Sequence, residues 1–245
     1  MGTVWRWLLF AGLLVVIAWG MPSRTGWNMI ANSTSNGSVT ELLIPGYLLL
    51  LVRDLRHPWE ALVGTRLGSA RRWWDVQVLV AGAAAVMLVV AMVIVFCVLS
   101  LLHHPWSWHW NTNSTQLVGG HVVATWSPWV WSVDALGLMT AGFWATGALW
   151  TVCALWWRSP WLAWLIIVAL NLVPLSFVFT PLAFLVWVLP GPQFAWIQHG
   201  TAFPHSPAST WSLGYAAVLL GLTTLGGGRL VRLAPWDARH GEPMG

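Results

Sequence analysis

The chain has 245 residues, of which 58% are hydrophobic and only 7% are charged. A soluble domain carries about 25% charged residues, so this composition excludes a soluble globular protein and predicts an all-α, polytopic integral membrane protein. All 11 basic residues are arginines and the formal net charge is +4. Charges this sparse exclude a nucleic-acid-binding groove, and the positive-inside rule accounts for them better.

The chain contains six apolar segments, and a membrane-spanning helix needs about 20 predominantly apolar residues. The predicted spans are residues 4–21, 39–52, 76–102, 135–157, 161–179 and 211–227. The first segment carries Arg6 near its start and is interpreted as an uncleaved helix rather than a signal peptide. The whole chain, 1–245, is then a single transmembrane domain with outer loops at 22–38, 103–134 and 180–210 and a cytoplasmic loop at 53–75.

The segment from Trp161 to Pro190 carries no charge and is too long for one span and too short for two. Its prolines predict a fifth span followed by a short re-entrant or interfacial helix at 180–190, before the last span. Just ahead of it, Arg158, Ser159 and Pro160 predict a tight turn with proline in the first turn of the next helix.

The arginines predict the orientation in the membrane. With the N-terminus inside, every arginine except Arg24 lies on the cytoplasmic side, and so do both chain ends. Tryptophans at the predicted span ends, including Trp73, Trp74, Trp156 and Trp157, are typical of aromatic belts. The predicted location is the cell membrane.

The loop at 53–75 reads RDLRHPWEALVGTRLGSARRWWD and is the only dense patch of charge in the chain. The pairs Arg56/Glu60 and Arg71/Asp75 are spaced i,i+4, which favours helix. A simple positive-inside anchor remains an alternative, but an anchor needs only two or three arginines. The length of the loop and its charges of both signs favour a docking surface for a soluble partner.

The layout of the chain resembles the permease subunit of ABC-2-type transporters, of the small bacterial type that serves peptide-antibiotic export or immunity. The similarity lies in six spans with both ends inside, a charged loop between spans two and three, an apolar hairpin before span six, and the string RLGSARRWW at 66–74. The resemblance implies that the loop is a coupling helix seated on a separate ATPase subunit, with Glu60, Arg66, Arg71 and Arg72 in contact. It also implies a homodimer or a pairing with a related permease.

No lysine occurs, so the chain has no Walker A motif, and ATP hydrolysis is expected on another polypeptide. No pattern nominates a catalytic site, and the protein is not expected to be an enzyme or to hold a cofactor. The expected function is export of an amphiphilic lipid or a hydrophobic peptide. An immunity protein that sequesters a peptide without ATP is a further alternative.

The outer loops supply another alternative. Imidazoles suit copper, zinc and haem iron, and the weak candidates for a metal site are His103, His104, His109 and His121. They allow a non-transporting subunit of an electron-transfer or metal-handling complex. Glu41 and Asp134 are the candidates for a polar or substrate site near the outer face.

Several uncharged residues are expected to govern packing within the spans. Gly142, Ala145 and Gly147 predict close packing of the fourth span. Polar side chains within the spans are expected to hydrogen-bond between helices; they are Thr140, Thr146, Thr151, Asn171 and Ser176. Cys97 and Cys153 lie in apolar segments and are expected to be buried free thiols.

Overall fold

The computed structural model describes residues 12, 30, 42–52, 70–103, 109, 127–157, 159–177 and 208–233. Within these residues the structure is all-α, as predicted, and its helices are α3 (Ile44–Leu51), α5 (Ala70–His103), α8 (Pro128–Trp157), α9 (Pro160–Phe177) and α13 (Ala208–Leu233). Among the described helices, α5 and α8 are long and apolar enough to cross a membrane. The predicted first span and the predicted re-entrant segment at 180–190 lie outside this part of the chain, apart from residue 12.

Helices α8 and α9 both begin at a Ser-Pro pair. The Ser127 hydroxyl oxygen accepts a hydrogen bond from the Val130 amide at 3.4 Å, and the Ser159 oxygen accepts one from the Leu162 amide at 3.2 Å. Each serine therefore caps amides that the first helical turn leaves unpaired, and proline follows where its missing N–H costs nothing. The predicted start of α9 is confirmed. Helix α8, however, starts at Pro128 rather than at 135, so residues 128–134 are helix and not outer loop.

The other helix bounds also differ from the predicted spans. Helix α5 starts at Ala70 rather than at 76, so the last residues of the charged loop form its first turns. Helix α9 continues past Pro174 to Phe177, and α13 extends beyond 211–227 at both ends. Helix α3 has 8 residues, about 12 Å at 1.5 Å per residue, and covers only part of the predicted second span.

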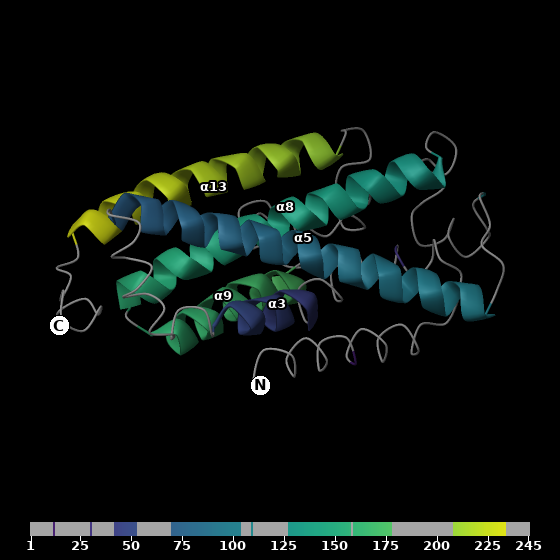
Figure 1. The fold of residues 1–245 in the computed structure, drawn as a ribbon, viewed down its shortest axis with the longest axis horizontal. Helices are drawn as coiled ribbons and strands as arrows, with labels where there is room; N and C mark the ends of the chain where they lie inside the picture. The colour runs from purple at the N-terminus through teal and green to yellow at the C-terminus, as the bar shows by residue number, and fades with distance from the viewer. Residues whose placement is uncertain are drawn as a thin grey trace.

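The four longer helices alternate in direction (Figure 1). The start of α5, the end of α8, the start of α9 and the end of α13 lie together at one end of the bundle, on the left of the view. Helix α8 is the central element because it contacts each of the other described helices. Gly142, Ala145 and Gly147 are buried on it, which confirms the predicted close packing.

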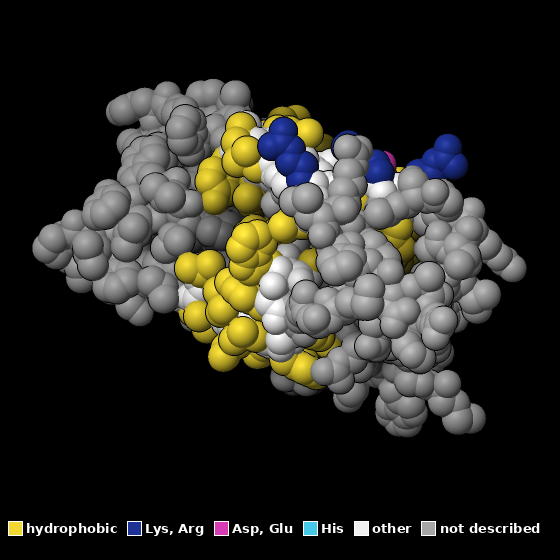
Figure 2. All heavy atoms as spheres, turned by 90° about the vertical axis from the view of Figure 1, so that its left-hand side faces the viewer, with side chains coloured by type: hydrophobic (Ala, Val, Ile, Leu, Met, Phe, Trp, Pro, Cys, Tyr) yellow, Lys and Arg dark blue, Asp and Glu magenta, His cyan; other side chains and the backbone are white. Residues whose placement is uncertain are grey.

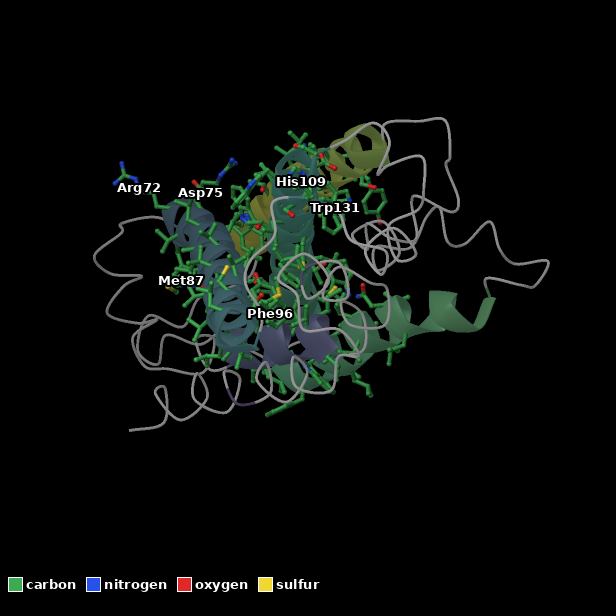
Figure 3. All side chains as sticks on the ribbon, turned by 90° about the vertical axis from the view of Figure 1, so that its right-hand side faces the viewer. Arg72, Asp75, Met87, Phe96, His109 and Trp131 are labelled. Atoms are coloured by element: carbon green, nitrogen blue, oxygen red, sulfur yellow. The ribbon has the colours of Figure 1, made fainter. Side chains whose placement is uncertain are left out.

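The core forms around α8. Its largest cluster includes Tyr47 of α3, Phe96 of α5, Phe143 and Trp150 of α8 and Ile167 of α9. A second cluster joins the first half of α8 to α13. Helix α5, by contrast, lies at the edge, and Figure 3 shows Met87 pointing away from the other helices while Phe96 points towards them.

Exposed apolar side chains on α5 lie along one face of the helix. They are Leu79, Val80, Val86, Met87, Val90, Ile94, Val98, Leu101 and Leu102. Such a face is typical of a helix that borders a lipid bilayer, because soluble proteins rarely expose so large an apolar surface to water.

Tryptophan and tyrosine side chains tie the helices together. Five of them each donate a hydrogen bond to a backbone carbonyl of a neighbouring helix. The pairs are Tyr47 to Ala81 (2.8 Å), Trp144 to Val78 (2.8 Å), Trp74 to Thr224 (3.1 Å), Trp164 to Pro45 (3.2 Å) and Trp150 to Pro160 (3.2 Å). These bonds join α3 to α5, α8 to α5, α5 to α13, α9 to α3 and α8 to α9.

The prediction that threonine and asparagine would bond between helices is wrong for three of the predicted residues. The hydroxyls of Thr140 and Thr151 and the amide nitrogen of Asn171 bond to carbonyls four residues earlier in their own helix. A short side chain on a helix reaches its own preceding turn more easily than a neighbouring helix. The longer indole and phenol side chains cross that gap.

Candidate functional site

The candidate docking residues that the structure describes lie on the first turns of α5. The Nε atom of Arg71 lies 3.4 Å from the Oδ1 atom of Asp75, which confirms the i,i+4 pair. The two side chains are 41% and 47% exposed. An ion pair this open to solvent contributes about 0–1 kcal/mol to stability. Because both side chains are exposed, both charged groups are accessible to a partner.

Arg72 is exposed on the next position, and Figure 3 shows it at the edge of the molecule, pointing away from the bundle near Asp75. Glu60 and Arg66, the other two predicted contacts, lie outside the described residues. The structure therefore brings together Arg71 and Arg72 of the predicted set, at the point where the loop enters α5.

The end of α13 adds a basic residue to the same surface. The side chain of Arg71 crosses α13 at Gly228, where an added Cβ atom would lie 3.3 Å from the Arg71 Cδ atom. Arg229 follows and is exposed. Figure 2 shows the arginine side chains of α5 and α13 gathered along one edge of this end, beside apolar surface.

We call Arg71, Arg72, Asp75 and Arg229 the arginine edge. The sequence predicted Arg229 to share the cytoplasmic side with the loop, but nothing in the sequence placed it beside Arg71. That proximity follows from the contact between the start of α5 and the end of α13.

The tryptophans at this end divide into two groups. Trp156, Trp157 and Trp161 are exposed, with Trp156 66% accessible, as expected of an aromatic belt. Trp73 and Trp74, which were predicted to mark the same interface, are buried inside the bundle. The reason is the contact of α5 with its neighbours, which covers both rings: Trp74 packs on α13, and Trp73 joins a cluster with residues of α8.

The outer candidates lie apart from the arginine edge. Asp134 is half-buried in the second turn of α8, which begins at the opposite end of the bundle (Figure 1). His109 is exposed. Glu41, His104 and His121 fall outside the described residues, as does the side chain of His103. Among the residues that the structure does describe, no three His, Cys, Asp or Glu side chains form a metal-binding group.

Some buried polar atoms have no hydrogen-bond partner within the part of the chain that the structure describes. They include the hydroxyl of Thr146 on α8 and the Oδ1 atom of Asn171 on α9, on residues that are fully buried. Thr146 differs from Thr140 and Thr151, whose hydroxyls bond to the preceding turn of α8. An unpaired buried polar group costs about 1–3 kcal/mol, so these atoms do not stabilise the bundle.

Comparison with protein-family models, with curated proteins and with solved structures gives no match.

Proposed function

We propose that the chain is the membrane-spanning permease subunit of an ATP-driven exporter of the ABC-2 type. It lies in the cell membrane as six spans with both ends in the cytoplasm. It works as a homodimer or beside a related permease, and a separate ATPase docks on residues 54–75. The cargo is an amphiphile, either a lipid or a hydrophobic peptide.

The observation that carries this proposal is the way in which the charged loop enters α5. The helix has 34 residues, about 51 Å at 1.5 Å per residue, whereas the hydrocarbon layer of a bilayer is about 30 Å thick. Its first turns hold Arg71, Arg72 and Asp75, which belong outside the hydrocarbon. A soluble partner that binds these residues acts on a single long helix that continues through the membrane.

The composition of the arginine edge favours docking over simple anchoring. An anchor needs positive charge only, whereas this surface also presents a half-exposed carboxylate, Asp75, within reach of Arg71. Charges of both signs at fixed spacing give a protein partner a pattern to match, and electrostatic complementarity contributes more to specificity than to affinity.

The second half of the transporter is inferred from the size of the bundle. Six spans, with α8 at their centre, enclose little room for a pathway, so a second copy or a related chain is needed to form one. The exposed apolar faces suit contact with lipid and with such a partner. The apolar, tryptophan-rich interior favours an amphiphile over ions or sugars.

The direct test is purification of the tagged protein from its native host in mild detergent, followed by mass spectrometry of the proteins that accompany it. A soluble protein with a Walker motif, in stoichiometric amount, is the expected result. Recovery of other membrane subunits, bound metal or haem with no ATPase would refute the proposal. It would favour the metal-handling alternative and direct attention to the outer histidines.

A further inference from the structure

The start of α5 and the end of α13 are joined by one close contact. The Trp74 ring is fully buried, and its Nε1 atom donates a hydrogen bond to the Thr224 carbonyl oxygen at 3.1 Å. The ring lies directly on Gly227, where a Cβ atom would overlap it. Only glycine permits this approach, so α5 and α13 are tied at the level of Trp74.

Glycines in the middle of a helix weaken it relative to alanine. Three occur in succession in α13, at Gly226, Gly227 and Gly228. Contacts explain two of them, because Gly227 accommodates Trp74 and Gly228 accommodates Arg71. At Gly226 an added Cβ would meet nothing within 4 Å. Packing does not require a glycine there, so its effect is to weaken α13 beside the tie.

We propose that Trp74 and the segment 226–228 form a coupling joint, which carries movement of the docking loop into α13. The inference rests on the proposed function. A partner that pulls on Arg71 and Arg72 moves the first turns of α5. Trp74 then draws the last turns of α13 with them, and α13 bends at its glycines. In this scheme Trp74 is a positioning residue and Gly226 supplies the flexibility.

Two variants interrupt the joint at different points. Gly226→Ala fits without a clash and stiffens α13. Trp74→Phe keeps an aromatic ring in the contact but removes the N–H group that bonds to Thr224. Neither change touches the exposed charges of the arginine edge, so the ATPase should still bind to both variants.

Each variant has a matched control elsewhere in the bundle. Gly221→Ala lies on the same helix, also with nothing within 4 Å, and gives the same gain in helix propensity. Trp144→Phe removes an equivalent indole bond, the one to the Val78 carbonyl between α8 and α5. Any general effect of stiffening a helix or of losing an indole N–H appears in the controls as well.

The measurement is the distance between spin labels at Leu213→Cys and Leu230→Cys, on either side of the glycines, with Cys97 and Cys153 replaced by alanine. A straight helix places the two labelled backbone positions about 26 Å apart, within reach of pulsed electron resonance. The full chain with its co-purified ATPase, in lipid nanodiscs, is compared without nucleotide and after trapping with ATP and vanadate.

Trapping is expected to shorten the distance in the parent protein and in both controls. Gly226→Ala should abolish the shift. Trp74→Phe should lower the ratio of shifted to unshifted protein about five-fold, which is the change in an equilibrium constant that the loss of one neutral hydrogen bond gives. A bound, hydrolysing ATPase with no shift in the parent protein would refute the joint alone, as would an unchanged shift in both variants. Absence of any co-purified ATPase would reject the joint together with the proposed function.

Discussion

Gly147 is the position at which a single methyl group is expected to loosen the core. An added Cβ would overlap the Tyr47 hydroxyl and lie 3.1 Å from the Leu51 Cδ1 atom. Tyr47 cannot move aside freely, because its hydroxyl donates to the Ala81 carbonyl on α5 at 2.8 Å and the residue is fully buried. Gly147→Ala therefore forces α3 away from α8 or breaks the bond to α5.

The size of the effect follows from three contributions. Overpacking of a filled core costs about 1–3 kcal/mol. Loss of the tyrosine hydrogen bond costs about 0.5–1.5 kcal/mol. Replacing a helical glycine by alanine returns about 1 kcal/mol of helix propensity. We expect a net destabilisation of about 0.5–3.5 kcal/mol.

The control is Gly137→Ala in the same helix, where an added Cβ meets nothing within 4 Å. That variant gains the helix propensity without the overlap and should be stabilised by up to about 1 kcal/mol. Gly137 and Gly147 are thus expected to respond to alanine with opposite signs. The measurement is the free energy of unfolding in micelles titrated with dodecyl sulfate and followed by circular dichroism. The double variant with Tyr47→Phe should lose less than the sum of the single changes. Equal stabilisation of both alanine variants would refute the reasoning.

Three further predictions follow. The double variant Arg66→Glu and Arg71→Glu should abolish ATPase association and leave membrane insertion intact. The control Arg24→Glu makes the same type of substitution at one residue on the predicted outer side and should retain the ATPase in pull-down. Binding of the ATPase to the double variant at native strength would refute docking on the loop. Thr146→Val replaces an unpaired buried hydroxyl by a methyl group and should raise the free energy of unfolding by about 1 kcal/mol; a loss of stability would mean that the hydroxyl has a partner. Trp164→Phe removes the 3.2 Å bond from α9 to α3 and should lower it by about 0.5–1.5 kcal/mol in the same assay, and no change would mean that the bond contributes nothing.

The sequence predicted the helical class and the approximate places of the described helices, because long apolar segments leave few other structures open. It located the start of α9 from Ser159 and Pro160, but it missed the equivalent start at Ser127 and Pro128. The surrounding stretch, rich in tryptophan and histidine, reads as an outer loop. Local composition cannot distinguish an aromatic loop from an aromatic first turn.

The candidate site was predicted in part for a similar reason. Arg71 and Asp75 lie four residues apart, so their pairing was visible in the sequence, whereas Arg229 reaches the same surface only through the contact between α5 and α13. Trp74 was interpreted as an interfacial residue because its chemistry suits a headgroup region. Gly227, which makes room for the Trp74 ring inside the bundle, lies on α13, far along the chain.

The two residues of each hydrogen bond between helices differ in how far they tolerate substitution. Each is a bond from a side chain to a main-chain oxygen, and every residue type carries that oxygen. Substitutions at Val78, Ala81 or Thr224 can exchange the side chain and leave the acceptor in place. The tryptophan or tyrosine on the other side has no such freedom, and neither does a glycine that makes room for it. A mutational scan of this protein should therefore find the cost of each tie at its tryptophan or tyrosine and at any glycine that makes room for that ring. Substitution of the residue that supplies the acceptor oxygen should leave the bond intact, although that residue holds half of it.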